Sequence, residues 1–240
     1  MLPCVWTRSG SGPVCVLLFW NVATVSETVA EAPLDTKERL LDVAERLFAE
    51  HGFDTVSLRS ITAEAGANLA AVNYHFGSKQ ALISAVVARW VEPVNRKRLE
   101  LLDQVQRGGE GEAEQIVGAF LDPVMEAAAA GQGGDNRFCK LMSRCIAARD
   151  ERVSRSVMEH FPEVVERFVA AISRCFPNLG SDTAHLRLMF MAGAMAHSLF
   201  HHDKLGMLSE GRCDLPSLGD VRGELVPFLA AGLGGADNDG

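Results

Sequence analysis

Apolar residues recur every three or four positions over most of this chain, which is the period of an amphipathic helix. The first clear example runs from Thr36 to Gly52, where Leu40, Ala44 and Leu47 share one side of a helical wheel. Glycine commonly ends helices, so the pattern predicts a helix that stops at Gly52. Few stretches alternate strictly between apolar and polar residues, and the chain therefore favours an all-α fold.

Two short helices are expected after this first one. Ser57 is placed to cap a helix over 58–65, because its hydroxyl can accept a hydrogen bond from a free backbone N–H. Gly66 supplies a turn, and a second short helix runs over 69–76 and closes at Gly77. A helix, a turn and a second short helix at this spacing are typical of a helix-turn-helix unit.

The rest of the chain is also predicted to be helical. Ser78 caps a longer helix, which we expect Pro93 to interrupt because proline removes an internal hydrogen bond. Pro162 is expected to break or restart a helix for the same reason. The remaining helices are predicted over 113–130, 136–149, 151–176, 181–203 and 217–233.

The domain organisation follows from changes in composition. The apolar run Val14–Trp20 is far shorter than the roughly 20 residues that span a bilayer, so no membrane partner is expected. Residues 1–33 do not resemble the rest and are interpreted as a disordered leader or a mis-assigned start. We predict an N-terminal helix-turn-helix domain over 34–94, a helical domain over 95–234, and a disordered tail over 235–240.

Charge is distributed unevenly along the chain. The net charge is −8, but between Lys37 and Arg98 nine Lys and Arg residues face seven Asp and Glu residues. An acidic body with a locally basic end suits a protein that touches DNA through one small module. The six cysteines form no CxxC pair, so neither a disulfide framework nor a structural zinc site is expected, and no cofactor is predicted.

The second short helix is the candidate reading element. In a helix-turn-helix unit this helix enters the major groove, and its alanines permit close approach while asparagine can bond adenine in a bidentate manner. Another helical hairpin could expose the same residue types on its solvated face. The outward side is predicted to consist of Asn68, Ala70, Ala71, Asn73 and Tyr74.

Phosphate contacts are predicted around this element. Tyr74 and His75, near its end, can reach phosphate oxygens through a hydroxyl and an imidazole. Ser57 and Arg59 begin the bracing helix and can do the same. Lys79 adds a positive charge at the start of the next helix.

The segment Thr36–Val87 contains five short motifs in an unbroken order: Ala44–Phe53, Ser57–Ile61, Ala65–Gly66, Tyr74–Lys79 and Ala81–Leu82. Through these motifs it resembles the N-terminal domain of TetR-type transcriptional regulators. The resemblance implies a TetR-like fold, with a three-helix DNA-binding domain followed by a helical ligand-binding and dimerisation domain. It also implies DNA contacts at Ser57, Arg59, Asn73, Tyr74, His75 and Lys79.

One departure and one finer similarity qualify this resemblance. Asn73 stands where most members carry tyrosine, so the base preference of the family cannot be transferred. The segments Asn73–Lys79 and Met191–Leu199 are similar to the fatty-acid-responsive (PsrA-like) branch. A small-molecule effector is therefore expected, with a fatty acid or acyl derivative as the candidate.

The helix over residues 185–202 is apolar on all sides and must be buried on two faces. One face carries Leu186, Met189, Phe190, Gly193 and Phe200, and we assign it to the protein's own domain. A central helix in a monomeric bundle would show the same pattern, but the resemblance favours a homodimer, since TetR-type proteins typically pair through their last two long helices. The predicted dimer interface is Leu188, Met191, Ala192, Met195 and Leu199.

A ligand pocket is predicted between the C-terminal helices. Met and Phe adapt to varied ligands, although ordinary core packing would explain most of the same residues. Arg137 and Arg144 flank the apolar stripe and could bind a carboxylate. The predicted pocket consists of Phe120, Val124, Phe138, Leu141, Met142, Arg144, Cys145, Phe161, Phe168 and Met189.

The function favoured by these features is that of a sequence-specific repressor, not an enzyme. It is expected to bind a near-palindromic double-stranded operator in the cytoplasm, at the bacterial nucleoid, and to be released by a small apolar or amphipathic ligand. One alternative is a helical metal-dependent enzyme using His197 and His201, which stand four residues apart. Another is a helical scaffold that binds only protein.

Overall fold

The computed structural model describes residues 35–109, 113–130, 136–200, 204–212 and 217–234. The predicted leader over 1–33 and the predicted tail over 235–240 lie outside these residues. Every regular element in the described part of the chain is a helix, which confirms the all-α prediction. Among the same residues, no helix combines the length and the apolar character that crossing a membrane requires.

The helices follow one another with short connections, and most of them match the predicted ranges within a few residues. Pro162 opens α8 and separates it from α7, as predicted, because proline fits the first turn of a helix. In chain order they are α1 (Thr36–His51), α2 (Leu58–Glu64), α3 (Leu69–His75), α4 (Lys79–Arg107), α5 (Ala113–Ala130), α6 (Arg137–Ala147), α7 (Glu151–Met158), α8 (Pro162–Cys175), α9 (Ser181–Phe200), α10 (Leu205–Leu208) and α11 (Leu218–Gly234).

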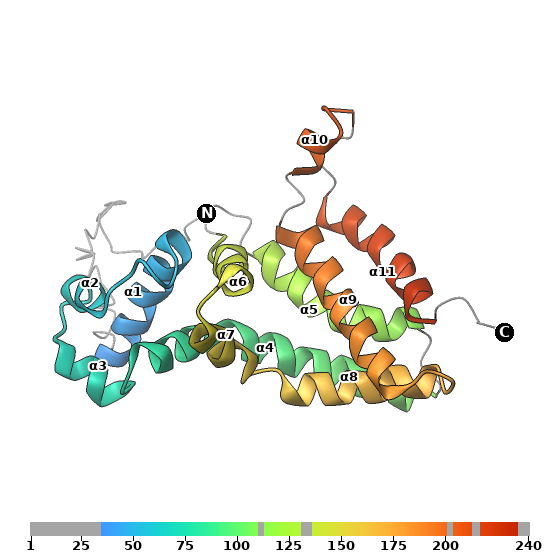
Figure 1. The fold of residues 1–240 in the computed structure, drawn as a ribbon, viewed down its shortest axis with the longest axis horizontal. Helices are drawn as coiled ribbons and strands as arrows, with labels where there is room; N and C mark the ends of the chain where they lie inside the picture. The colour runs from blue at the N-terminus through green and yellow to red at the C-terminus, as the bar shows by residue number, and fades with distance from the viewer. Residues whose placement is uncertain (1–34, 110–112, 131–135, 201–203, 213–216, 235–240) are drawn as a thin grey trace, which may run out of the picture. The chain divides into compact units, whose positions relative to one another are not determined.

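The first three helices form a small head on the N-terminal half of α4 (Figure 1). Each of the four helices contributes a side chain that is fully removed from solvent. Their burial fixes the angles between the helices, because interiors are packed as densely as crystals of small organic molecules. The central residues of this core are Phe48, Ile61, Val72, Leu82 and Val86.

Helix α4 is continuous for 29 residues, so the predicted interruption at Pro93 is wrong. Pro93 is exposed to solvent, whereas Val91 and Val94 are buried on the other side of the helix. Water can therefore satisfy the carbonyl that the proline leaves without a donor, while packing holds the helix on both sides of it. The predicted domain boundary between residues 94 and 95 falls inside this helix.

The second half of α4 packs with α5, α8, α9 and α11 into a larger body, visible on the right of Figure 1. Its core contains Leu102, Leu121, Phe168, Ile172 and Met191, each with essentially no exposed surface. Phe168 meets the ring of Phe120 edge-on, with the ring centres 5.2 Å apart. Edge-to-face packing of this kind is favourable for aromatic rings beyond the area it buries.

Helix α6 contributes to both cores. Leu141 and Cys145 are buried against the head, while Phe138 is buried in the body. Phe138 also contacts Trp90 of α4 and Phe200 of α9 through its ring. A side chain movement in the body can therefore reach the head through this one short helix.

Replacement of Leu121 by alanine tests the packing of the body. Leu121 is fully buried, so Leu121→Ala should lower the free energy of unfolding by about 2–5 kcal/mol through lost burial and the cavity it leaves. Met207 is 81% exposed, and Met207→Ala should change it by less than about 0.5 kcal/mol. Urea unfolding followed by circular dichroism measures both, and equal effects would contradict the packing described.

Candidate DNA interface and ligand pocket

Capping side chains and one glycine define the start of α2 and the turn that leads from α2 into α3. Ser57 accepts a hydrogen bond from the Ser60 backbone N–H at 3.0 Å, and the Ser60 hydroxyl accepts one from the Ser57 backbone N–H. Gly66 adopts φ +60°, which residues with a Cβ rarely tolerate. Asn68 then caps α3 by accepting a hydrogen bond from the Ala71 N–H at 2.9 Å. Gly66 and the Asn68 cap therefore define where α2 ends and α3 begins.

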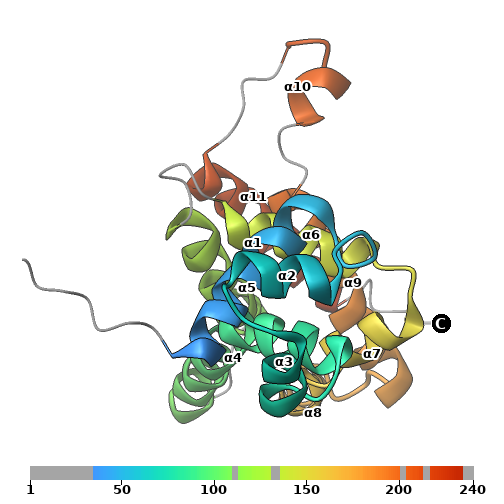
Figure 2. The same ribbon diagram turned by 90° about the vertical axis from the view of Figure 1, so that its left-hand side faces the viewer.

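Helix α3 lies on the side of the head that faces the viewer in Figure 2, and most of its side chains are exposed to solvent. Val72 is fully buried and anchors the helix to the head, while Tyr74 is 86% exposed. Leu69, which the helical period places inward, is instead 44% exposed, because α3 touches the head along a narrow stripe only. Of the predicted reading residues, Asn68, Ala70, Asn73 and Tyr74 are exposed and Ala71 is partly buried.

The predicted phosphate contacts differ in their surroundings. Ser57 and Arg59 are exposed, and His75 is half-buried beside the ring of Tyr74. Lys79 is also half-buried, and its Nζ donates a hydrogen bond to the Phe53 backbone oxygen at 2.5 Å. Burial lowers the pKa of this ammonium group below its usual value. Lys79 thus holds the loop between α1 and α2 in the structure.

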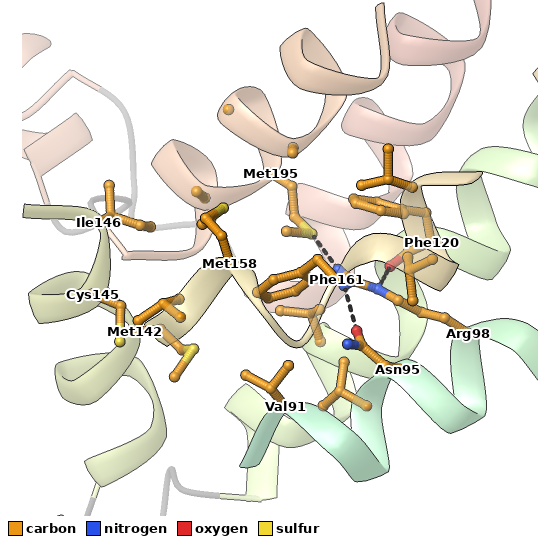
Figure 3. A pocket seen from close by; sticks show the side chains of 18 of the residues that line it. Val91, Asn95, Arg98, Phe120, Met142, Cys145, Ile146, Met158, Phe161 and Met195 are labelled. Carbon is orange, nitrogen blue, oxygen red and sulfur yellow. Dashed lines mark hydrogen bonds between the residues drawn. The ribbon is translucent and has the colours of Figure 1, made fainter. Parts of the chain in front are cut away.

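A pocket of about 540 Å³ lies between α4, α5, α6, α7, α8 and α9. A volume of this size is typical of sites for drug-sized ligands. Figure 3 shows side chains converging on it from these helices, most of them valine, phenylalanine and methionine. The pocket is therefore suited to an apolar molecule.

Seven of the ten predicted pocket residues line this cavity. Leu141 does not, because it is buried in the core of the head. Arg144 does not either, since it is exposed and its Nη2 donates to the Glu50 backbone oxygen at 3.1 Å. Phe168 lies behind Phe120 in the core of the body. The predicted residues found in the lining are Phe120, Val124, Phe138, Met142, Cys145, Phe161 and Met189.

The sequence prediction missed the buried polar residues of the pocket. Asn95 and Arg98 of α4 line it and are almost completely buried. A signal for them existed, because both lie on the stripe defined by Val91, Val94 and Leu102. A charged residue at a position where the helical period demands an apolar one marks a special environment.

The two faces of α9 are the reverse of those predicted. Leu188, Met191, Met195 and Leu199 are buried in the body of their own chain, and Ala192 is partly buried. The helical wheel reveals two apolar faces but does not indicate which one α8 and α11 cover. The exposed apolar side chains of α9 are instead Leu186 at 48%, Met189 at 58% and Phe190 at 61%.

The alternative metal site at His197 and His201 is only partly described by the structure. His197 is exposed on α9, and His201 lies outside the described residues. Within the described ranges, no group of three or more His, Cys, Asp or Glu side chains is arranged to hold a metal.

Two family models match the chain along most of its described length. Residues 40–86 match the model of bacterial regulatory proteins of the tetR family, and residues 118–232 match the tetracyclin repressor-like C-terminal domain. The chain belongs to the TetR family. The resemblance predicted from its motifs, and the TetR-like fold, are thereby confirmed.

Curated TetR relatives match parts of the chain. The transcriptional repressor AcnR of Corynebacterium efficiens is 31% identical over 88 residues, which are 35% of this chain and 45% of AcnR. The uncharacterized regulator TtgW of Pseudomonas putida is 35% identical over 98 residues, which are 41% of this chain and 69% of TtgW. The match thus spans less than half the length of AcnR.

A solved structure of the same fold extends over more of the chain. The transcriptional regulator FadR from Bacillus subtilis, in complex with stearoyl-CoA, superimposes with a TM-score of 0.55. The comparison covers 81% of this chain and 98% of FadR at 11% sequence identity. It shows that the TetR arrangement of head and body is shared.

Substitutions of Asn68 test the capping of α3. Asn68→Ala removes the side-chain acceptor for the Ala71 N–H and should lower the free energy of unfolding by about 1 kcal/mol. Asn68→Ser keeps a capping oxygen and should leave it nearly unchanged. Urea titration distinguishes the two variants, and the capping role is wrong if both unfold like the wild type.

Proposed function

We propose that the protein is a sequence-specific DNA-binding transcriptional regulator. It acts as a homodimer that represses by binding a near-palindromic operator, and a small apolar or amphipathic ligand releases it. The observation that carries this proposal is the exposure of the capped helix α3. Of the residues of α3, Val72 is the one that is fully buried in the head, so the rest of the helix is free to meet DNA. Such a protein works in the bacterial cytoplasm, at the nucleoid.

The reading surface is assigned to the outer side of α3. Ala70 and Ala71 are small enough to let the helix approach base edges closely, and Asn73 carries the amide that can read adenine. Tyr74 projects from the same helix, where its hydroxyl can reach a phosphate oxygen. Base reading is thus proposed for Asn73.

Phosphate binding is assigned to the surroundings of α3. Ser57 and Arg59 on the bracing helix, together with Asn68 and His75, complete the proposed DNA surface. Lys79 contributes its positive charge while its ammonium group holds the Phe53 carbonyl. We therefore give Lys79 a positioning role as well as an electrostatic one.

Dimerisation is proposed through α9 and α11, two helices that pack against each other within the chain. The exposed apolar side chains of both helices would form the interface. Leu186 and Phe190 are four residues apart on α9, and Phe228 of α11 is 71% exposed. Monomeric proteins rarely leave several large apolar side chains exposed to water close together. A twofold pair would present two heads to half-sites about 34–36 Å apart.

The ligand response is proposed to pass through α6. This helix lines the pocket with Met142 and Cys145 and also contacts α1 of the head. Arg137 of α6 lies 3.3 Å from the carboxylate of the buried Glu45 on α1. A ligand that favours a displaced α6 would favour a displaced head, provided that it binds this state more tightly.

The assigned reading role of Asn73 is tested by comparison with Arg59. Asn73→Ala should reduce discrimination between the operator and single-base variants by about 1–3 kcal/mol while non-specific binding stays intact. Arg59→Ala should weaken all sequences alike and reduce the salt dependence of binding, since a phosphate contact releases counterions. Fluorescence anisotropy at several salt concentrations measures both effects. Equal loss of specific and non-specific binding in Asn73→Ala would refute its role.

The proposed dimer is tested by placing a charge on the exposed face of α9. Phe190→Glu should convert a dimer into a monomer, because the carboxylate would have to be buried without a partner. Met207→Glu, an apolar-to-acidic change on the exposed surface of α10, should leave the dimer intact. Sedimentation velocity gives the masses. A monomeric wild type at micromolar concentration, or a dimeric Phe190→Glu protein, would count against this interface.

A further inference from the structure

Arg98 is a buried cation that makes no ion pair with any of the residues that the structure describes. Arg98 is only 3% exposed. Its guanidinium donates one hydrogen bond from Nε to the Phe120 backbone oxygen at 2.8 Å and another from Nη1 to Asn95 Oδ1 at 3.2 Å. It also lies over the ring of Phe120, 4.0 Å from the ring centre. All of these partners are neutral.

The third contact of the guanidinium is the weakest. Nη2 points at the sulfur of Met195, 3.6 Å away, and a thioether is a poor hydrogen-bond acceptor. Among the described residues, no Asp or Glu side chain forms an ion pair with Arg98. Burial lowers the pKa of Arg98 to about 9, so the group remains protonated at neutral pH. A buried charge in this condition is strongly unfavourable unless something else compensates it.

The position of Arg98 in the pocket indicates what kind of group would compensate its buried charge. Figure 3 shows its guanidinium facing the space beside Phe161 and Met195, with Met142, Cys145 and Ile146 across the cavity. The lining between these two ends is almost entirely apolar. The pocket therefore combines one cationic end with an apolar chamber.

We propose that the ligand of this pocket is an anionic amphiphile, whose negative group binds the Arg98 guanidinium while its apolar body extends toward α6. The inference rests on the proposed function only in taking this cavity as the effector site. An oxygen anion would replace the Met195 sulfur at Nη2 and gain charge-assisted hydrogen bonds in a water-poor site. A carboxylate and a phosphate share this chemistry, and the experiment distinguishes them.

The apolar body of the ligand would extend from the guanidinium of Arg98 to α6, the helix proposed to move on ligand binding. Its far end would meet Cys145 and Met142, on the helix that also touches the head. The two ends of the ligand thus have separate roles: Arg98 selects the charge, and α6 responds to the volume. An amphiphile without the anion would fill the chamber but leave Arg98 uncompensated.

The first experiment needs no variant. Dodecanoate and dodecyl phosphate, kept below their micelle concentrations, and dodecanol, kept below its solubility limit, are titrated calorimetrically into the full chain at pH 7.5. One charge-assisted contact of about 1.5–3 kcal/mol corresponds to a preference of about 10- to 150-fold for the anions over dodecanol. The tighter of the two anions identifies carboxylate or phosphate as the natural group. Equal binding of dodecanol and dodecanoate, or no binding of either anion, overturns the proposal.

The second experiment assigns the preference to Arg98. Arg98→Met should lose the preference for dodecanoate, leave dodecanol binding unchanged and raise the melting temperature of the free protein, since the uncompensated charge is gone. Arg98→Lys should keep part of the preference. Arg96→Met, an exposed position on the same helix, is the matched control and should behave as the wild type.

Arg98 could instead serve only to join α4 to α5 and α9. In that case Arg98→Met would lower the melting temperature and weaken dodecanoate and dodecanol equally, and the proposal would be wrong. If the variant fails to fold, the comparison of ligands on the wild type still decides.

DNA binding is measured separately to keep the two proposals apart. Wild type and Arg98→Met should both retain genomic operator fragments. Dodecanoate, at a concentration that saturates the wild type but not the variant, should release only the wild type. A protein that prefers dodecanoate but retains no DNA contradicts the proposed function alone. One that retains DNA but does not distinguish dodecanoate from dodecanol contradicts the anionic ligand alone.

Discussion

The structure depends on one continuous helix that belongs to two cores. Helix α4 buries Leu82 and Val86 in the head and Val94 and Leu102 in the body, and it rises about 43 Å over its 29 residues. A break in it would leave two small helical groups, each with a core open to water on one side. The cost of the internal Pro93 is tolerated because the buried stripe on the opposite side continues without a gap.

A second element, α6, joins the same two cores through side chains instead of through backbone. Its Leu141 is inserted into the head, and its Arg137 approaches Glu45, whose pKa burial raises despite the nearby Arg89 and Arg137 cations. Because burial disfavours the charged form of Glu45, the stability of its carboxylate depends on how closely Arg89 and Arg137 approach it. The contact between α1 and α6 is therefore sensitive to small displacements, which is the property expected of a joint that transmits ligand binding.

The head was the part of the fold most fully predictable from the sequence. Caps such as Ser57 and Ser78 and the glycine at 66 act over a few residues, and the helices begin and end close to where those residues predict. The body was predictable as helices but not as an arrangement. Periodicity showed that α9 has two apolar faces, yet only tertiary contacts reveal that Met191 faces inward and Phe190 outward. For the same reason the sequence did not reveal the place of Arg98 in the pocket, because the groups around its guanidinium come from helices far away in the sequence.

Tyr74 has a practical consequence. It is the only tyrosine in the chain, and its ring stands 86% exposed on α3. Incorporation of 3-fluorotyrosine would therefore place a single fluorine nucleus on the proposed reading helix without any mutation. One resonance, free of overlap, would then report in solution whether that helix is bare or docked.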